Sequence, residues 1–214
     1  MRKTLHILYK LYVGQTLARI HMNLAFANHS LRGEVLDVGG GRNPDYFSYF
    51  QKEHMTSLRS IDGSSHQIDF ETDPLPFADK SIDTVILSNV LEHIYNHSFL
   101  VAEIKRILTQ KGRVVGFVPF WVGYHADPHD YFRYTNEALV RIFGDAGFTH
   151  ISITACEVGP FLANFNTIVL SLPRVIRPLM YLLYWIPNRL FKTFRPRSFA
   201  RNPLGYVFNV NSYE

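Results

Sequence analysis

The sequence contains almost no cysteine. Cys156 is the single one among 214 residues, so neither an intramolecular disulfide nor a cysteine metal cluster can form. Hydrophobic residues make up 47% of the chain and charged residues 19%, which is typical of a globular protein and not of a disordered one. The length is sufficient for one α/β domain with a sizeable core. A lone thiol is compatible with a reducing cytoplasm.

Acidic residues are absent from both ends of the chain. Residues 1–33 contain five Lys or Arg and residues 158–213 contain seven, with no Asp or Glu in either segment. Residues 34–157 carry ten basic and seventeen acidic side chains. The sequence therefore predicts an acidic core domain between two basic, apolar ends. The start resembles a signal peptide, but Lys10 interrupts its apolar run and no small-residue cleavage site follows, so we do not expect secretion.

A long uninterrupted apolar run is also missing. The stretch Ile168–Phe191 is rich in apolar and aromatic residues, but Arg174 and Arg177 lie inside it beside two prolines. It therefore lacks the roughly 20 consecutive apolar residues that a membrane-spanning helix needs. Apolar and aromatic side chains beside Arg and Lys favour a helix that lies in a membrane interface. A helix expected over Leu5–Leu24 has the same character.

Strand and helix patterns alternate through the middle of the chain. Seven strands are expected, at Glu34–Val38, Ser57–Ile61, Gln67–Phe70, Ile82–Leu87, Arg113–Val118, Ile151–Ala155 and Tyr206–Val210. Helices are expected at Phe99–Leu108 and at Thr135–Ala146, the second capped by Thr135 or Asn136 and ended by Gly147. This alternation predicts an α/β fold with a doubly wound, mostly parallel seven-stranded sheet.

The expected organisation is one domain with four parts. Residues 1–33 form a basic helical arm, and residues 34–157 form the cofactor-binding core. Residues 158–204 form a proline-punctuated, apolar cap of short helices, inserted before a last strand within residues 205–214. No internal repeat or low-complexity tract is found.

A glycine cluster follows the first predicted strand. Asp37 is followed by Val38 and then by Gly39, Gly40 and Gly41, which lets the backbone turn tightly and approach a ligand. Ligands of open parallel sheets bind beyond the carboxyl ends of the strands. The dinucleotide pattern G-x-G-x-x-G fails because Pro44 stands at its last glycine, and the phosphate-loop pattern is absent. A cofactor without phosphates is favoured over a dinucleotide, and a plain strand-ending turn is the alternative.

Further acids follow the next strands. Asp62 and Gly63 end the second predicted strand, where an acid can accept hydrogen bonds from both ribose hydroxyls of a nucleoside. An ordinary Asp-Gly turn would look the same. Another acidic stretch, Asp69-Phe70-Glu71, is followed by a Leu-Pro-Phe segment and by the predicted strand Ile82–Leu87, after which comes Asn89.

Taken together, these motifs resemble the class I S-adenosylmethionine-dependent methyltransferases of the small-molecule type. The resemblance is carried by LDVGGG at 36–41, IDG at 61–63, LPFADKSIDTVILSNVLEHI at 75–94 and RILTQKGRVV at 106–115, and it covers roughly residues 34–150. It implies S-adenosyl-L-methionine as cofactor. Gln110 and Lys111 depart from the family's turn before the fifth strand, and Gly40 stands where a small residue such as cysteine is frequent.

The resemblance also implies roles for the residues of these motifs. Asp37 and the three glycines would surround the methionyl part of the cofactor, and Asp62, beside Gly63, would hold the ribose. Asp69 or Glu71 would accept a hydrogen bond from the adenine amine, with Phe70 nearby. Asn89 would close the floor beneath the methionine. The choice between Asp69 and Glu71 stays open.

The segment after the fifth strand concentrates imidazoles, acids and aromatic rings. His125 or His129, or else His93 from the Leu-Glu-His stretch, can act as a base near neutral pH. Candidate acceptor-binding residues share the same segment: Tyr124, Asp130, Tyr131, Arg133 and Tyr134. Alternatively, Asp130 and Arg133 pair to fix the loop and the tyrosines pack. The His-x-Asp-x-His arrangement can in principle bind a metal, but methyl transfer does not require one, so none is expected.

The chemistry predicted is O-methylation of a small or lipid-linked acceptor. The cap and arm would cover the acceptor and contact anionic membrane, or else form an ordinary packed cap with a solvated basic rim. Nucleic acid is disfavoured because the Arg and Lys are dispersed among apolar residues, and because Asn-Pro-Pro-Tyr is absent at Ser88–Leu91. Cys156 lies in the predicted sixth strand, away from any site of attack on a pyrimidine. A non-catalytic cofactor-binding partner subunit is the remaining alternative.

Overall fold

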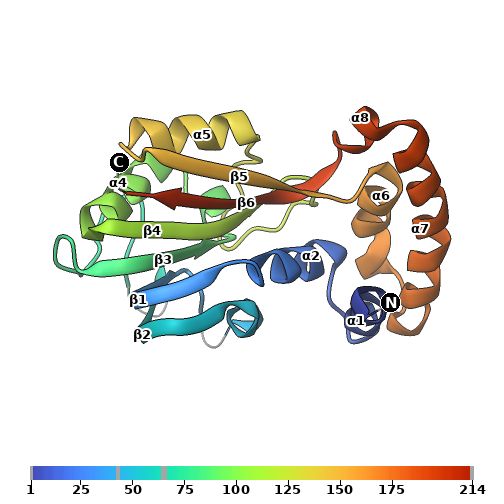
Figure 1. The fold of residues 1–214 in the computed structure, drawn as a ribbon, viewed down its shortest axis with the longest axis horizontal. Helices are drawn as coiled ribbons and strands as arrows, with labels where there is room; N and C mark the ends of the chain where they lie inside the picture. The colour runs from blue at the N-terminus through green and yellow to red at the C-terminus, as the bar shows by residue number, and fades with distance from the viewer. Residues whose placement is uncertain (1, 42–43, 64–66, 213–214) are drawn as a thin grey trace.

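The computed structural model describes residues 2–41, 44–63 and 67–212. Its centre is a six-stranded sheet with the order β2-β1-β3-β4-β6-β5. Strand bounds are β1 Ser30–Val38, β2 Gln51–Ile61, β3 Ile82–Ser88, β4 Leu108–Pro119, β5 His150–Glu157 and β6 Pro203–Asn211. β1 to β4 pair in parallel, whereas β6 runs antiparallel to both β4 and β5. The predicted mostly parallel α/β fold is confirmed (Figure 1).

The predicted number of strands is wrong by one. Gln67–Phe70 does not form a strand, because this stretch is a turn closed by hydrogen bonds from the backbone N–H of Thr72 and Asp73 to the carbonyl of Asp69. A four-residue segment bounded by acids offers too few apolar side chains to extend a buried sheet. In the described part of the chain, β2 is therefore the edge strand on this side of the sheet.

Helices cover both faces of the sheet. Their bounds are α1 Arg2–Tyr12, α2 Leu17–Phe26, α4 His97–Ile107, α5 Asn136–Asp145, α6 Pro160–Ile168, α7 Arg177–Phe194 and α8 Pro196–Phe199. Short 3-10 turns are η1 Asp45–Tyr49, η2 Leu91–His93, η3 Val169–Ser171 and η4 Arg174–Ile176. Thr135 caps α5 by accepting a hydrogen bond from the N–H of Ala138, as its sequence predicts.

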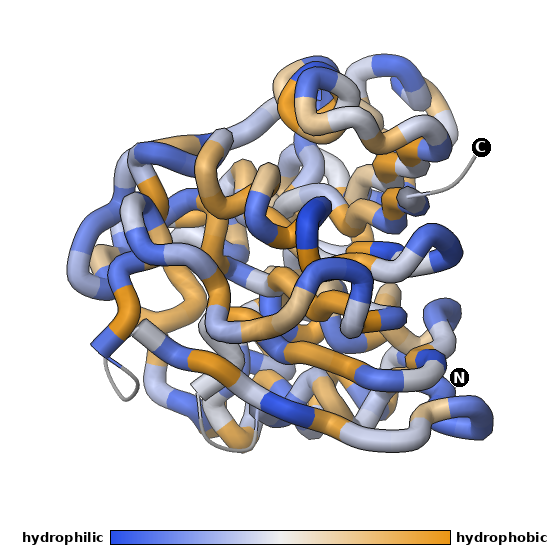
Figure 2. Tube along the Cα trace, turned by 90° about the vertical axis from the view of Figure 1, so that its left-hand side faces the viewer, coloured by the Kyte–Doolittle hydropathy of each residue, from blue (hydrophilic) through white to orange (hydrophobic). Residues whose placement is uncertain are grey.

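Alternation along the central strands divides the core between the two faces. Leu36 and Val38 of β1 belong to one cluster with apolar residues of α4 and α5, whereas Val35 packs with residues of α2 and η1. A period of two sends successive side chains to opposite faces, so a strand buried on both faces is continuously apolar. Hydrophobic residues accordingly follow the strands and hydrophilic ones the outer turns (Figure 2).

The N-terminal stretch is not the single helix that we expect over Leu5–Leu24. It divides into α1 and α2 at a turn in which Gly14 has a φ of +105°, and Thr16 then caps α2 by accepting from the N–H of Arg19. Glycine adopts this left-handed conformation without steric cost, and a capping threonine restarts the helix in a new direction. The turn directs α1 away from the sheet (Figure 1).

A helical cap lies beyond the carboxyl ends of the parallel strands. It consists of α1 and of the segment between β5 and β6, residues 158–202, which holds α6 to α8 (Figure 1). Its core joins α1, α2, α6 and α7 through residues such as Leu11, Leu17, Phe165 and Tyr181. The two basic ends of the chain thus meet in space. No helix in the described part of the chain is both long and apolar enough to cross a membrane.

Candidate active site

The glycine loop after β1 is shaped by close contacts. Gly39 has a φ of +72°, and a Cβ there would lie 2.6 Å from Cγ2 of Val90. At Gly40 a Cβ would lie 2.0 Å from Oδ2 of Asp37, closer than real carbon–oxygen contacts allow. Gly41 also has a positive φ. The three glycines therefore form a bare backbone wall, and Gly40 is needed for space rather than for flexibility.

Asp37 supports this loop from behind. Its side chain is 1% exposed and both oxygens accept from the Tyr46 hydroxyl, at 2.8 and 2.9 Å. Burial raises the pKa of the Asp37 carboxyl to about 7, against the hydrogen bond from Tyr46, which lowers it. Gly40 and Tyr46 line a cavity that Asp37 itself does not reach. Direct contact of Asp37 with a cofactor stays a prediction from the sequence.

One cavity, of about 700 Å³, lies beyond the ends of β1, β2 and β3. It collects seven of the ten predicted cofactor residues, without Asp37, Gly40 and Gly41: Gly39, Asp62, Gly63, Asp69, Phe70, Glu71 and Asn89. Phe70 is buried beneath it. Asn89 is held at the end of β3 with a φ of +54°, and its N–H donates to the carbonyl of Phe117. Ligands of open parallel sheets bind at this edge, beyond the carboxyl ends of the strands.

The structure separates the two candidates for an adenine contact. Both carboxylate oxygens of Glu71 already accept from backbone N–H groups, those of Tyr95 at 3.0 Å and Asn96 at 3.3 Å. Asp69 is exposed, and its Oδ1 accepts from the N–H of Glu71 at 2.8 Å. Glu71 thus has fewer lone pairs left for a ligand than Asp69, and which of the two contacts an adenine stays a prediction.

A second cavity, of about 680 Å³, lies between the strand ends and the cap. Gln15, Thr16 and Arg19 from the start of α2, together with Leu170 from η3, form its cap side. Gly39, Asn89, His93 and Asp127 line both cavities. The two cavities are therefore neighbouring halves of one cleft, with room for a cofactor on one side and an acceptor on the other.

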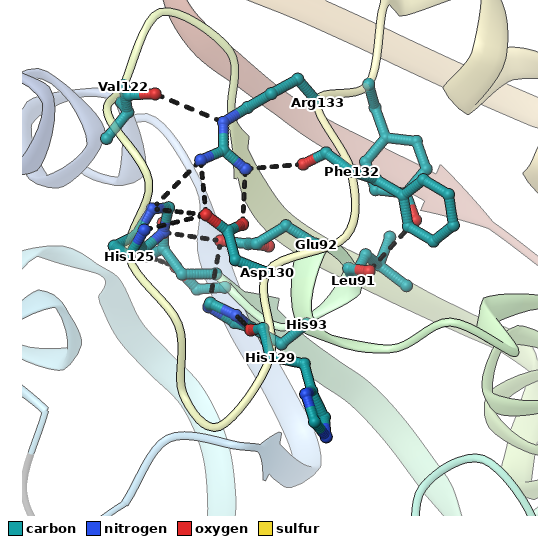
Figure 3. A network of polar contacts seen from close by, with 12 residues as sticks. Leu91, Glu92, His93, Val122, His125, His129, Asp130, Phe132 and Arg133 are labelled. Carbon is teal, nitrogen blue, oxygen red and sulfur yellow. Dashed lines mark hydrogen bonds and ion pairs between the residues drawn. The ribbon is translucent and has the colours of Figure 1, made fainter.

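The loop after β4 is fixed by an Asp–Arg pair. Asp130 accepts from Nη1 and Nη2 of Arg133 at 2.6 and 2.7 Å and from the N–H of His125 at 2.8 Å (Figure 3). The Arg133 guanidinium holds the pKa of Asp130 well below its usual range. This arrangement agrees with the reading in which Asp130 and Arg133 fix the loop. Their contact with an acceptor stays a prediction.

Two of the three candidate bases lie together, and the third does not join them. The rings of His93 and His125 meet edge to face with centroids 5.2 Å apart, and both line the second cavity. The nearby Glu92 carboxylate raises the pKa of His125 above its ordinary value, against partial burial, which lowers it. The ring of His129 packs against Tyr131 and points away from this group (Figure 3).

The predicted acceptor tyrosines have different surroundings. Tyr131 lines the first cavity, whereas Tyr124 is 80% exposed and contributes to neither. Tyr134 is buried, and its hydroxyl donates to the carbonyl of Leu91 at 3.0 Å, which makes it part of the core. The alternative in which the tyrosines pack therefore describes Tyr134.

Sequence reasoning missed Glu92 and Asp127 as site residues. Asp127 lies at the junction of the cavities. Glu92 is completely buried in η2, beside His93 and His125. Its signal was present as the middle residue of Leu-Glu-His, but only the fold shows that a carboxylate there faces the loop after β4.

The part of the chain that holds most of the first cavity is similar to a known protein family. Residues 36–116 match the family described as "Methyltransferase domain". They hold the glycine loop, the acids that follow β2 and the Leu-Glu-His turn. The match covers 81 of the 214 residues, less than half of the chain. The predicted resemblance is confirmed, and the match supports S-adenosylmethionine as the cofactor of this domain.

One curated protein is similar in sequence, and several solved structures have a similar fold. Uncharacterized protein MJ0638 of Methanocaldococcus jannaschii is 29% identical over 133 residues, which are 56% of this chain and 52% of that protein. The chain thus spans about half of that relative. Phosphoethanolamine N-methyltransferase 2 of Haemonchus contortus, in complex with S-adenosyl-L-methionine, shares 15% identity with a TM-score of 0.54, covering 96% of this chain and 56% of its own. A methyltransferase of Thermotoga maritima shares 10% identity with a TM-score of 0.54, covering 89% of this chain and 88% of its own. Similarity at these identities establishes the fold alone.

Proposed function

We propose that the protein transfers a methyl group from S-adenosylmethionine to an oxygen atom of an acceptor in the second cavity. The observation that carries this proposal is the divided cleft, whose halves meet at Gly39, Asn89, His93 and Asp127. Aligning a donor and an acceptor across such a junction is the main task in an in-line displacement, worth about 7–11 kcal/mol in favourable cases.

The residues of the first cavity, together with the adjoining glycine loop, fit the cofactor. A side chain at Gly39 or Gly40 would collide with Val90 or Asp37, so the loop presents backbone where a ligand must approach closely. We assign Asp62 to the ribose hydroxyls, Asp69 to the adenine amine and the glycine loop to the methionyl part. When bound, the cofactor supplies a methyl group on a positively charged sulfur, which is already activated for transfer.

The acceptor side requires a place for a proton to leave. A hydroxyl must lose its proton before or during methylation, and assistance at this step is worth about 10²–10⁴-fold. His93 and His125 face the second cavity beside Glu92, so we place the hydroxyl next to these three residues. His129 lies on the cofactor side and is not assigned this role.

Calorimetry with S-adenosylhomocysteine tests the cofactor assignment. We expect wild type to bind, and Asp62→Ala to weaken binding at least about 10-fold, because hydrogen bonds to a carboxylate contribute about 1.5–3 kcal/mol. Asp145→Ala is the matched control, since that carboxylate is 77% exposed and lies on α5. Absence of binding by wild type at about 1 mM would refute the proposal.

The cap provides a second element of the proposed function, which is contact with an anionic membrane. Large apolar side chains on α7 are exposed at helical spacing: Leu179, Leu183, Ile186, Leu190 and Phe194. α1, which packs against α7, exposes Leu5, Tyr9 and Tyr12. Neither end of the chain holds an acidic residue before Glu214, and Arg and Lys flank both helices. Exposed apolar stripes with basic flanks suit the interface of an anionic bilayer.

This surface favours a lipid-linked acceptor. The second cavity is bounded on one side by the cap, through Gln15, Arg19 and Leu170. An acceptor with a membrane-embedded tail could therefore place its polar head in the cleft while the cap rests on the bilayer. Methyl transfer to a membrane lipid extract, compared with a soluble metabolite extract, measures this preference.

Vesicle co-sedimentation tests the membrane contact. We expect wild type to bind vesicles that contain phosphatidylglycerol and to bind neutral phosphatidylcholine vesicles weakly. The double variant Leu183→Glu and Ile186→Glu should lose binding, because it places two charges on the apolar stripe. Val140→Glu is the control, since Val140 is an exposed apolar residue of α5. Equal sedimentation of the double variant would refute the membrane contact.

A further inference from the structure

Three side chains beside the cleft direct ligand atoms at one point. Oε1 of Glu92 lies 3.7 Å from Nε2 of His93 and also 3.7 Å from Nε2 of His125. One oxygen and two nitrogens thus lie within 4.8 Å of one another. In Figure 3 the dashed lines from His93 and His125 converge on the Glu92 carboxylate.

The Glu92 carboxylate has no other partner of its own. It is 0% exposed, and neither of its oxygens accepts a hydrogen bond from a described residue. A buried carboxylate that accepts no hydrogen bond is unfavourable, because it loses its hydration, and the positive charges that act on Glu92 from Arg133 and His125 reach it without a hydrogen bond. The site therefore calls for a cation next to Glu92.

The two histidines are arranged to meet this need as ligands. Nδ1 of His93 lies 2.5 Å from the carbonyl of His129, and Nδ1 of His125 lies 2.9 Å from the carbonyl of Gly123. A carbonyl only accepts, so each Nδ1 carries a hydrogen, and in the neutral imidazole Nε2 is left with a lone pair. Metal-binding histidines are commonly held in this way by a backbone carbonyl.

Arg133 does not change this assignment for His125. Its Nη2 lies 3.3 Å from Nδ1 of His125, but the same nitrogen already donates to Asp130 at 2.7 Å and to the carbonyl of Gly123 at 3.1 Å. The shorter contact of Nδ1 is with the Gly123 carbonyl. With both imidazoles neutral, two lone pairs face a carboxylate oxygen, which is repulsive without a positive charge between them.

We propose that Glu92, His93 and His125 bind one divalent transition-metal ion of the Zn²⁺ type. Ligands on a tetrahedral zinc with bonds of about 2.1 Å lie roughly 3.4 Å apart, which the two separations from the Glu92 oxygen exceed by about 0.3 Å, and all three ligand atoms lie within 4.8 Å of one another. Two imidazoles and one carboxylate suit Zn²⁺, Co²⁺ or Mn²⁺ better than Mg²⁺, which prefers oxygen ligands.

The position of the ion suggests a role in methyl transfer. This role rests on the proposed function, whereas the binding of the ion does not depend on it. Three protein ligands leave a coordination position open, and His93 and His125 both line the acceptor cavity. An acceptor hydroxyl that coordinates the ion loses its proton to solvent water more readily, as metal-bound water does. The Asp130–Arg133 pair then positions the loop that carries His125, through the hydrogen bond from the His125 N–H to Asp130.

Cobalt titration of untagged, chelator-treated protein tests ion binding without cofactor or acceptor. We expect one Co²⁺ per chain, seen as a visible absorption band, with displacement by Zn²⁺ and no competition from Mg²⁺. Glu92→Gln should weaken binding at least about 100-fold, because losing a direct ligand exceeds the 10–100-fold loss seen for outer partners. His129→Ala and His54→Ala are controls, since neither imidazole belongs to the group.

The outcomes separate this proposal from the methyltransferase assignment. No stoichiometric Co²⁺ binding up to about 1 mM, or equal binding by Glu92→Gln, overturns the metal site and leaves cofactor binding untouched. A proton held among the three residues would then supply the charge. If Glu92→Gln fails to fold by circular dichroism, His125→Phe replaces it, since that side chain is 38% exposed; retained binding in His125→Phe also overturns the proposal.

Discussion

At the scale of single residues, the end of β1 is governed by space and by burial. Gly40 has no room for a Cβ because Asp37 occupies that position. We therefore expect Gly40→Ala to displace the Asp37 carboxylate or the loop, and to weaken S-adenosylhomocysteine binding at least about 10-fold, as misplacing a binding group does. Calorimetry on Gly40→Ala measures this. Gly123→Ala is its control, because a Cβ at Gly123 meets nothing within 4 Å. Equal affinities for the two variants would contradict the role of the wall.

Asp37 links this site to pH. Its pKa is about 7 in the folded protein and about 3.8 unfolded, so between these values the folded state binds the additional proton. The stability associated with neutral Asp37 is complete below about pH 4 and is lost as the pH rises to about 7, by up to about 4 kcal/mol.

The neutral variant Asp37→Asn should remove this pH dependence. It can still bond to the Tyr46 hydroxyl, so we expect it to match wild type near pH 4 and to exceed it in free energy of unfolding above pH 7. Denaturant titrations of the ligand-free proteins at several pH values measure the difference. A gap between the variants that stays constant with pH would show that folding does not raise the pKa of Asp37.

At the scale of elements, buried polar side chains hold the cap together. Arg177, at the start of α7, is 6% exposed and donates to the carbonyls of Leu172 at 2.9 Å, Gly14 at 3.3 Å and Leu170 at 3.3 Å. Asn166 of α6 accepts from the N–H of Ala18 in α2 at 2.9 Å. These contacts tie the two ends of the chain across more than a hundred residues, so the cap depends on long-range bonds.

Removing the Arg177 contacts should loosen the cap. Arg177→Met leaves three carbonyls without their donor, and we expect a loss of about 2–4 kcal/mol, or roughly 5–15 °C in Tm for a chain of this length. Arg189→Met is the control, because Arg189 is an exposed arginine of the same helix. Thermal unfolding followed by circular dichroism decides it, and equal melting of both variants would show that the bonds contribute nothing net.

At the scale of the whole molecule, charge and apolar surface coincide on the cap. The basic ends meet there, whereas the acids are confined to the core, apart from Glu214. Raising NaCl from about 50 to about 500 mM should weaken binding to anionic vesicles about 10-fold or more, because screening removes the attraction of the Arg and Lys. Some binding should remain, since the apolar stripe is insensitive to salt. Sedimentation that does not change with salt would exclude the charges from the contact.

The amino-acid sequence by itself determined the fold class and most of the cofactor cavity. Strand periodicity, the Gly39–Gly41 cluster and the acids after the strands are local patterns, and parallel strands necessarily bring their carboxyl ends to one edge. The strand-end pattern predicts Asp62 at this edge, whereas the places of Phe70 and Asn89 were implied by the resemblance to methyltransferases.

Only the tertiary structure decided what lies opposite that edge. It excluded the strand at Gln67–Phe70, divided the N-terminal helix at Gly14 and turned Asp37 toward Tyr46. It also brought Glu92 within reach of His125 across a long loop. Such contacts join residues that are distant in the chain, and they depend on packing and loop geometry that no local periodicity encodes.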